Sequence, residues 1–399
     1  MRGMTQALRL MLVLSVPQVI GWASAFYAIA LLARPISHDL GFGLPVAFAG
    51  TSLFLAALAG TSRAMVPLFG RFGAGPMLGA GSLLGAVGFG VLALSGGLVS
   101  YAAGWVLVGV AGAGMLSAPA NALLVQVLGW QAKRWIAGMM LITGLSGSIG
   151  LPLTMLLLDW TDWRGVFWIF AALHLLVCAP LHLWASLRAG PPRQIPTEAP
   201  TTAGPADRAR FRWLALSVSM IGFVTWGFAI VAIAVLQASG LSELQAVAAV
   251  ALIGVATVAS RAAEFVFARS LPASTGAVWA SAALCLSLGL LAIGTPAFVW
   301  AFVVLYGAAS GSLSVARATL PLDLFDPAAY AGMAARLALP MNLAFAAAPP
   351  VFGLILDQAG ARAVLAVALV LGLGAWTGFR RLRGMAPQKE RAGVARPAV

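Results

Sequence analysis

Three arginines and one glutamate stand inside stretches of this sequence that are otherwise apolar. Arg261 lies more than two helical turns before Arg269, so in a helix it sits about 12 Å deeper than that residue. Placing an arginine so deep in a membrane span costs about 2.5–3.5 kcal/mol on insertion scales, so its presence there needs a reason. A guanidinium group binds a carboxylate through two parallel hydrogen bonds. We therefore predict that Arg261 and Arg317, with support from Arg63, receive an anionic solute.

Glu264 is the only acidic residue that we place within a span, and it follows Arg261 by three positions. Residues at that spacing share one face of a helix. Two interpretations are open. The two side chains could form an internal brace, or Glu264 could gain and lose a proton during a transport cycle, because burial and a neighbouring arginine shift a carboxyl pKa in opposite directions.

The pattern around Arg261 occurs once more, at a distance of about half the chain. The residues that match Ser260, Arg261, Ala262, Phe267 and Arg269 are Ser62, Arg63, Ala64, Phe69 and Arg71. Gly109 matches Gly307 at the same offset. The chain is thus predicted to consist of two repeated halves in the same orientation, with Arg63 and Arg71 at a gate between them.

Composition determines the class of protein. Of the 399 residues 61% are hydrophobic and 9% are charged, whereas soluble domains carry about 25% charged residues. From these hydrophobic and charged fractions we expect an integral membrane protein. A net charge of +13 would suggest nucleic acid in a soluble protein, but the positive-inside rule explains it here, so no nucleic-acid partner is expected. Cys178 and Cys285 lie in apolar runs and predict no disulfide framework.

The elements that must position the charges are apolar runs of about 20 residues, the length of a membrane-spanning helix. Twelve such runs are present, which predicts an all-α fold of twelve transmembrane helices. They cover residues 10–33, 45–68, 77–97, 101–126, 136–158, 165–187, 213–237, 244–267, 276–294, 298–320, 332–356 and 362–380. The first run is too long for a cleaved signal peptide.

The spans group into four segments of the chain. Residues 1–187 form the N-terminal six-helix half, 188–212 a Pro-rich basic cytosolic linker, 213–383 the C-terminal half and 384–399 a cytosolic tail. Most Lys and Arg then fall on the side of both termini, which the positive-inside rule assigns to the cytoplasm. The predicted location is the bacterial inner membrane, with lipid around a monomer.

With twelve spans, a six-plus-six repeat and a basic central linker, the chain resembles the major facilitator superfamily over 10–383. The family motif Gly-x-x-x-Asp-Arg-x-Gly-Arg-Arg between the second and third spans is represented only by Arg71 and Gly73. Asp162 to Phe167 is similar to the Trp-Arg-Phe signature of the sixth span. A weaker resemblance is to a bacterial branch that contains riboflavin and copper importers, but Met220 alone stands where the copper importers carry methionine and histidine pairs.

The resemblance implies that the first, second, fourth and fifth spans of each half line a central cavity. The polar and aromatic residues on those spans are then the predicted substrate-binding residues: Gln18, Trp22, Tyr27, Asn121, Trp226, Arg261, Arg317 and Asn342. An alternative for Gln18, Asn121 and Asn342 is that they hold helices together, as buried amides commonly do. His174 and His182, on a span that faces lipid in the family, are assigned to packing.

Together these patterns predict a secondary transporter that moves a small organic anion by alternating access, without a cofactor, a bound metal or an ATP-binding motif, and with possible proton coupling. The alternatives are proton-driven efflux of drugs and uptake of a vitamin or a metal. A remote alternative is an intramembrane serine protease, from the sequence Gly144-Leu-Ser-Gly147. Conversion of the fold to a sensor would require a soluble partner domain, which the sequence does not supply.

Overall fold

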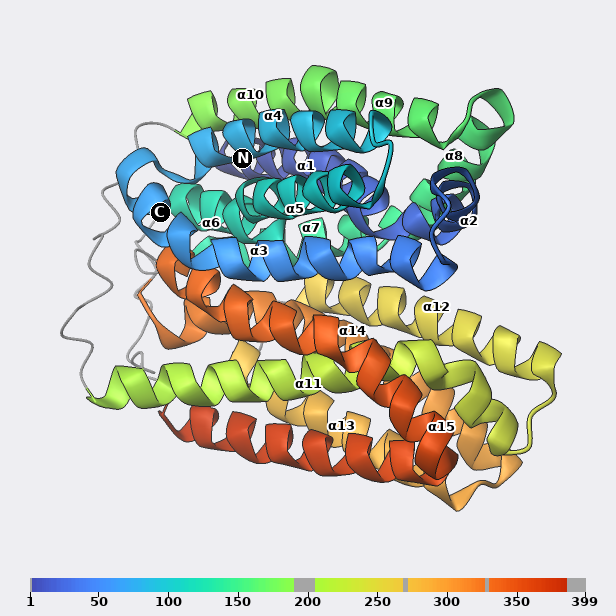
Figure 1. Cartoon of the computed structure of the whole chain (residues 1–399). Helices are drawn as coiled ribbons and strands as arrows, with labels where there is room; N and C mark the ends of the chain where they lie inside the picture. Colours follow the sequence, from blue (N-terminus) through green and yellow to red (C-terminus); the bar gives the residue numbers. More distant parts are fainter. Residues whose placement is uncertain (1, 190–204, 268–271, 327–329, 386–399) are drawn as a thin grey trace, which may run out of the picture.

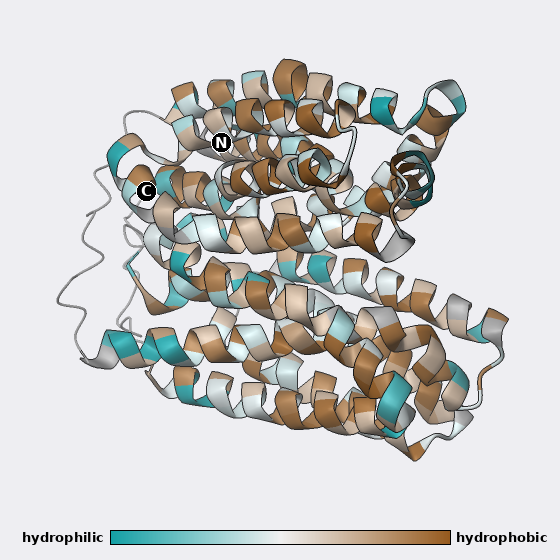
Figure 2. Ribbon diagram, in the orientation of Figure 1, coloured by the Kyte–Doolittle hydropathy of each residue, from teal (hydrophilic) through white to brown (hydrophobic). Residues whose placement is uncertain are grey.

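The computed structural model describes residues 2–189, 205–267, 272–326 and 330–385, which form helices and short connections. The chain folds into two halves that lie one against the other (Figure 1). The start of α1 and the end of α15 lie at one end of the molecule, which we call the termini end; the other is the distal end. Hydrophobic residues predominate along the helices, as a protein in contact with lipid requires (Figure 2).

The N-terminal half contains six spans, several of which are interrupted. They are formed by α1 (Arg2–Trp22), η1 (Ala23–Tyr27) and α2 (Ile29–Leu40); α3 (Leu44–Phe72); α4 (Ala74–Ala93); α5 (Leu98–Met115) and α6 (Ser117–Leu128); α7 (Ala132–Thr143) and α8 (Ser146–Trp160); and α9 (Trp163–Leu173), η3 (His174–Cys178) and α10 (Ala179–Ala189). A short 3₁₀ turn, η2 (Gly129–Gln131), joins α6 to α7. The elements η1 and η3 are single turns of π-helix.

The C-terminal half also contains six spans. They are formed by α11 (Pro205–Ala238), α12 (Glu243–Phe267), α13 (Ala273–Ile293), α14 (Pro296–Leu324) and α15 (Tyr330–Met385). The last of these holds two spans, because the backbone turns sharply at Gly360 with φ 77°, a conformation that glycine adopts without a steric cost. The all-α fold of twelve spans in two halves is therefore confirmed.

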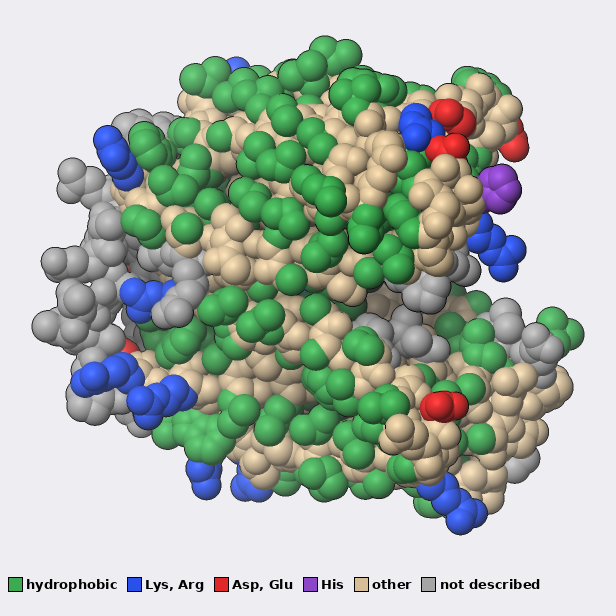
Figure 3. Space-filling model, in the orientation of Figure 1, with side chains coloured by type: hydrophobic (Ala, Val, Ile, Leu, Met, Phe, Trp, Pro, Cys, Tyr) green, Lys and Arg blue, Asp and Glu red, His purple; other side chains and the backbone are tan. Residues whose placement is uncertain are grey.

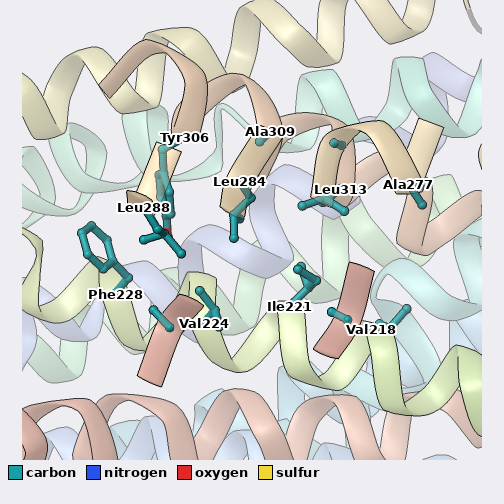
Figure 4. Packing of buried hydrophobic residues seen from close by; sticks show 14 of the residues in the cluster. Val218, Ile221, Val224, Phe228, Ala277, Leu284, Leu288, Tyr306, Ala309 and Leu313 are labelled. Atoms are coloured by element: carbon teal, nitrogen blue, oxygen red, sulfur yellow. The ribbon is translucent and has the colours of Figure 1, made fainter. Parts of the chain in front are cut away.

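Apolar packing explains why each half holds together. In the C-terminal half, Val224 and Phe228 of α11 contact Leu284 and Leu288 of α13 and Tyr306 of α14 in one buried cluster (Figure 4). A separate cluster forms the core of the N-terminal half. Equivalent helices cross at equivalent glycines in the two halves.

A methyl group added at Gly109 would lie 2.6 Å from Cβ of Ala57, and one added at Gly307 would lie 2.7 Å from Cβ of Ala256. The sequence match between these two glycines thus corresponds to one repeated helix crossing.

The predicted linker, 188–212, is partly helical, because α11 begins at Pro205. Proline is favoured in the first turn of a helix, where its missing N–H has no role. Asp207 accepts a hydrogen bond from Arg210 at 2.9 Å, and Arg210 also donates to the carbonyl of Met385, which ties this first turn to the end of α15. Residues 190–204 and 386–399, the rest of the predicted linker and tail, lie outside the described residues, as does Arg269.

Candidate functional site

A cavity of about 770 Å³ lies between the two halves. It is bordered by η1 and α3 of the N-terminal half and by α11, α12, α14 and α15 of the C-terminal half. The halves are parted at the distal end (Figure 3). Arg261 and Arg317 are the charged residues of the described lining, which includes no acidic side chain. An excess of positive charge between apolar walls favours an anion.

Arg261 reaches across the gap between the halves. Its Nε atom donates to Oγ of Ser314 on α14 at 2.9 Å. At the other end of the side chain, Nη1 lies against Gly144, in the break between α7 and α8, where an added methyl group would collide with it. The phenol of Tyr27 on η1 lies within electrostatic range of the guanidinium. Arg261 thus donates a hydrogen bond to a described side chain of α14 and also borders the cavity.

Arg317 lies at the base of an aromatic stack. Its Cζ atom is 5.1 Å from the centre of the Phe345 ring. Phe345 in turn stacks on Trp226 with 4.9 Å between ring centres and 10° between planes, and Trp226 meets Phe26 of η1 edge-on at 4.9 Å. The stack therefore passes from the C-terminal half into the N-terminal half. Arg261 lies within electrostatic range of Arg317, so two like charges face one cavity.

A second cavity of about 140 Å³ adjoins the first on the side of the termini, and Trp226, Arg317 and Phe345 border both. Trp22, Asn121 and Asn342 line this smaller cavity. Tyr330 of α15 lies beside Asn121 at this cavity, so both halves contribute to its lining, and the Tyr330 hydroxyl donates to the carbonyl of Ala318 at 2.8 Å. The Oδ1 atom of Asn121 is buried and has no hydrogen-bond partner among the described residues. The smaller cavity thus offers a hydrogen-bond acceptor close to Arg317.

Comparisons with known proteins agree with this arrangement. The sequence profile described as the Major Facilitator Superfamily matches residues 17–272. The chain belongs to this superfamily. Membership of this superfamily places the chain among transporters rather than enzymes. No curated protein matches the sequence at a significant level.

Solved structures of the superfamily share the fold at low sequence identity. The human organic anion transporter MFSD10 (TETRAN) is 17% identical, with a TM-score of 0.69 over 94% of this chain and 99% of that one. The E. coli fucose:proton symporter FucP is 13% identical, with a TM-score of 0.69 over 94% and 98% of the two chains. A structure of FucP in the outward conformation is 12% identical, with a TM-score of 0.70 over 93% and 98%. Identities this low show the fold alone.

In this superfamily member Gln18 lines neither cavity. The side chain is fully buried, with Nε2 donating to the carbonyl of Met115 at 2.9 Å and Oε1 accepting from Ser117 at 3.4 Å. Met115 and Ser117 flank the break between α5 and α6, which leaves backbone groups without helical partners. The contacts of Gln18 are those of a residue that braces this break.

The transporter is closed at the termini end by an apolar seam. One buried cluster there joins residues of the N-terminal half, such as Leu14, Phe69 and Trp135, to Leu322 and Tyr330 of the C-terminal half. Beside it, α7 packs against α12. Arg134 lies 5.0 Å from the ring of Phe265, and an added methyl group at Gly138 would lie 2.7 Å from the same ring. This packing therefore lies between the larger cavity and the termini end.

Glu264 faces this seam rather than the cavity. Its carboxyl lies near Ser312 of α14 and is attracted by Lys133 at the start of α7, in the other half. The ion pairs within 4 Å between described residues are Arg164–Asp39 and Arg210–Asp207, so no such pair joins Arg261 to Glu264 in this conformation. Both residues lie on α12, but Arg261 bonds Ser314 of α14, whereas Glu264 is attracted by Lys133.

Of the two predicted gate residues, Arg63 and Arg71, only Arg71 has a described side chain. The side chain of Arg63 lies outside the described residues. Arg71, at the end of α3, is exposed and lies 5.1 Å from the ring of its neighbour Phe72. A sequence search for polar residues missed Phe26 and Phe345, which complete the aromatic stack. An aromatic residue is not conspicuous in an apolar helix. Phe26 and Phe345 could be singled out from the sequence only because they lie on spans that line the cavity in the superfamily scheme.

The remaining polar candidates do not form a catalytic site. Ser146 is buried and donates to the carbonyl of Thr143, so it is not paired with a histidine. His174 bonds Ser24, and His182 bonds Ser82. The arrangement of a serine protease is therefore absent from the described part of the chain, which also contains no group of three or more His, Cys, Asp or Glu side chains that could hold a metal ion.

Proposed function

We propose that this transporter carries a small organic anion by alternating access, with Arg261 and Arg317 as the anion-binding residues. One observation carries the proposal. The larger cavity presents two guanidinium groups and no acidic side chain in its described lining. Desolvated like charges are unfavourable without a partner of opposite sign, and a carboxylate bound between them would supply one.

The aromatic stack indicates which kind of anion the cavity would favour. Phe26, Trp226 and Phe345 present ring faces and edges beside Arg317. Ring–ring contacts contribute about 0.5–1.5 kcal/mol beyond the burial of apolar area. The favoured substrate is therefore an amphipathic anion, with a carboxylate for the arginines and an apolar or aromatic part for the stack. Tyr27 and Trp22 border the same path from the larger to the smaller cavity.

The parting of the halves at the distal end supports the assignment of this conformation to a state open at that end. In the complementary state the seam of α7 and α12 would separate and the distal end would close, with the halves rocking about the bound anion. Lys and Arg gather at the termini end (Figure 3), so the positive-inside rule places that end in the cytoplasm. In a bacterial inner membrane the open end then faces outward.

Glu264 is the residue through which proton coupling would act. Its ionised carboxyl attracts Lys133 across the closed seam. Protonation would remove this attraction and favour separation of the seam, so a proton gradient could bias the cycle. Asn121 and Asn342 would contact the anion as it approaches the termini end, whereas Gln18 would act only as a brace.

Uptake by the purified protein in proteoliposomes tests the proposal. Radiolabelled benzoate, phenylacetate and succinate represent the anions, with fucose and the cationic dye ethidium for comparison. We expect uptake of an aromatic carboxylate, abolished in Arg261→Gln and partly retained in Arg261→Lys, which keeps the charge and loses the planar fork. Arg9→Gln, a change at an exposed arginine of α1, is the matched control.

Two results would contradict this assignment. Full anion uptake by Arg261→Gln and Arg317→Gln would leave both arginines as structural residues. Transport of ethidium or fucose in preference to every anion would instead support export of drugs or transport of a neutral solute, the main alternatives for this fold.

A further inference from the structure

Two turns of π-helix face each other inside the N-terminal half. In η1 the N–H of Ala28 bonds the carbonyl of Ala23 at 2.9 Å, and in η3 the N–H of Ala179 bonds the carbonyl of His174, both across five residues. Such turns are rare and often occur at functional sites. η3 packs against α1 and α4, and η1 packs against α8. The two irregular turns are thus parts of one packed region.

A single hydrogen bond joins the two turns. Nε2 of His174 lies 3.1 Å from Oγ of Ser24, and both side chains are 1% exposed. The hydroxyl of Ser24 donates to the carbonyl of Ile20 at 2.8 Å, so its lone pair is left to accept from Nε2–H of His174. Nδ1 is then the unprotonated nitrogen of the ring, which agrees with its lack of a partner among the described residues.

The other side of the His174 ring meets apolar groups. It lies 5.0 Å from the ring of Phe89, and an added methyl group at Gly85 would lie 3.3 Å from Nδ1. Among the described residues, Ser24 is therefore the hydrogen-bonding partner of His174, and this bond connects the side chain to η1.

The π turn at η1 determines which residues face the cavity. Ser24 points toward His174, whereas Phe26 and Tyr27, two and three residues later, border the cavity. A π turn contains one residue more than the same stretch of α-helix. Its loss would rotate the residues on one side of it by about 100°, the angle between successive residues of an α-helix. Tyr27 would leave the cavity edge beside Arg261, and buried Ala28 would move toward it.

We propose that His174 is a positioning residue, which through Ser24 maintains the π turn of η1 and so holds Tyr27 and Phe26 at the anion site. The inference deepens the proposed function, since these two residues border the site of Arg261 and Trp226. It assigns a role in the central cavity to a residue of the sixth span, which does not itself reach that cavity.

His182 provides a matched control within the same span. It is also 1% exposed, and its Nδ1 lies 2.8 Å from Oγ of a serine, Ser82. That bond joins the regular helices α10 and α4 and involves no π turn. Replacement of His182 therefore removes an equivalent buried histidine–serine bond without acting on η1.

The experiment measures side-chain accessibility and needs no substrate. Single cysteines are introduced as Tyr27→Cys or Ala28→Cys, and the rate of reaction with a small methanethiosulfonate reagent is measured in the full-length protein in proteoliposomes. The native Cys178 and Cys285 are buried, and the parent protein gives their background rate. In the parent sequence we expect position 27 to react and position 28 to be protected.

His174→Leu keeps the volume of the ring and removes the hydrogen bond. We expect labelling at position 27 to fall and labelling at position 28 to rise, each by about tenfold, the shift expected for loss of one buried hydrogen bond. His174→Gln should keep the labelling rates of the parent at positions 27 and 28, because the amide nitrogen of glutamine can donate from the position of Nε2. His182→Leu should leave both rates unchanged. If His174→Leu does not give a monodisperse protein, Ser24→Ala removes the same bond from the other side.

Unchanged rates in His174→Leu and Ser24→Ala would overturn the proposal, as would equal changes in the His174 and His182 variants. Since the reagent reports on η1 directly, a failure of anion uptake would contradict the proposed function and leave this result unaffected.

Discussion

Replacement of Arg317 by glutamine should change stability and anion binding in opposite directions. Burial of an arginine in a membrane span costs about 2.5–3.5 kcal/mol on insertion scales. The contact with the Phe345 ring offsets about 0.5–2 kcal/mol of this, and the like charge of Arg261 adds to the cost. Glutamine is polar but uncharged. We therefore expect Arg317→Gln to stabilise the ligand-free protein by about 1 kcal/mol, which is a rise of a few °C in melting temperature.

Binding should be affected in the other direction. A carboxylate that loses two charge-assisted hydrogen bonds loses about 3 kcal/mol, more than a hundredfold in Kd. In a fluorescence melting assay, the parent protein should be stabilised by the best-bound aromatic carboxylate of the uptake panel. The Arg317→Gln variant should melt higher without that anion and should not respond to it.

The control and the refuting result use the same assay. Arg9→Gln should keep the melting temperature and anion response of the parent. A lower melting temperature for Arg317→Gln, together with an unchanged response to the anion, would show that Arg317 braces the fold and does not bind substrate.

Four further predictions concern other parts of the chain. A reporter inserted near Gly240 should lie on the opposite side of the membrane from one fused to the C-terminus, and the same side for both would contradict twelve spans. Gly138→Leu should force α7 away from α12 and increase cysteine labelling from the termini end, whereas unchanged labelling would mean that this seam does not close the path. Asp39 lies near the end of α2, past the apolar run 10–33 of the first span, where Arg164 donates to it and lowers the pKa of that carboxyl below its usual 3.8. The melting difference between the parent and Asp39→Asn should therefore be present at neutral pH and vanish as the pH falls through that lowered pKa. A difference that persists in acid would point to packing. Glu264→Gln, which imitates the protonated carboxyl, should lose pH-driven accumulation and retain counterflow, and continued accumulation would exclude Glu264 as the coupling residue.

The sequence predicted the spans because burial in lipid requires long apolar segments, and each segment carries that signal by itself. It did not predict the breaks at Leu116 and Gly144 or the π turn at Ala23–Tyr27. Hydropathy averaged over about 20 residues does not change when one residue is added to a turn. These irregular turns also depend on distant partners, such as Gln18 and His174, which become visible only once the helices are packed.

The charged residues show a different limit of prediction from sequence. Arg261 and Arg317 were predicted from the cost of burial alone, and both border the cavity. The helical spacing of Arg261 and Glu264 suggested a pair, because spacing determines which face of a helix a residue occupies. It does not determine which neighbouring residue a long side chain will contact, and here Arg261 bonds Ser314 of α14, whereas Glu264 is attracted by Lys133 of α7.

The repeated halves contribute unequally to the candidate site. At the offset that relates Gly109 to Gly307, Arg317 corresponds to Pro119, just after the break between α5 and α6. In the N-terminal half, the polar side chain near this break, Gln18, is used within the half to bond the carbonyl of Met115. In the C-terminal half α14 runs unbroken and needs no such brace, so Arg317 remains available to the cavity. The unbroken helices thus present the charge, and the interrupted helices shape the wall opposite to it. Selectivity for the charge of a solute should therefore depend on the C-terminal half, and selectivity for its shape on η1.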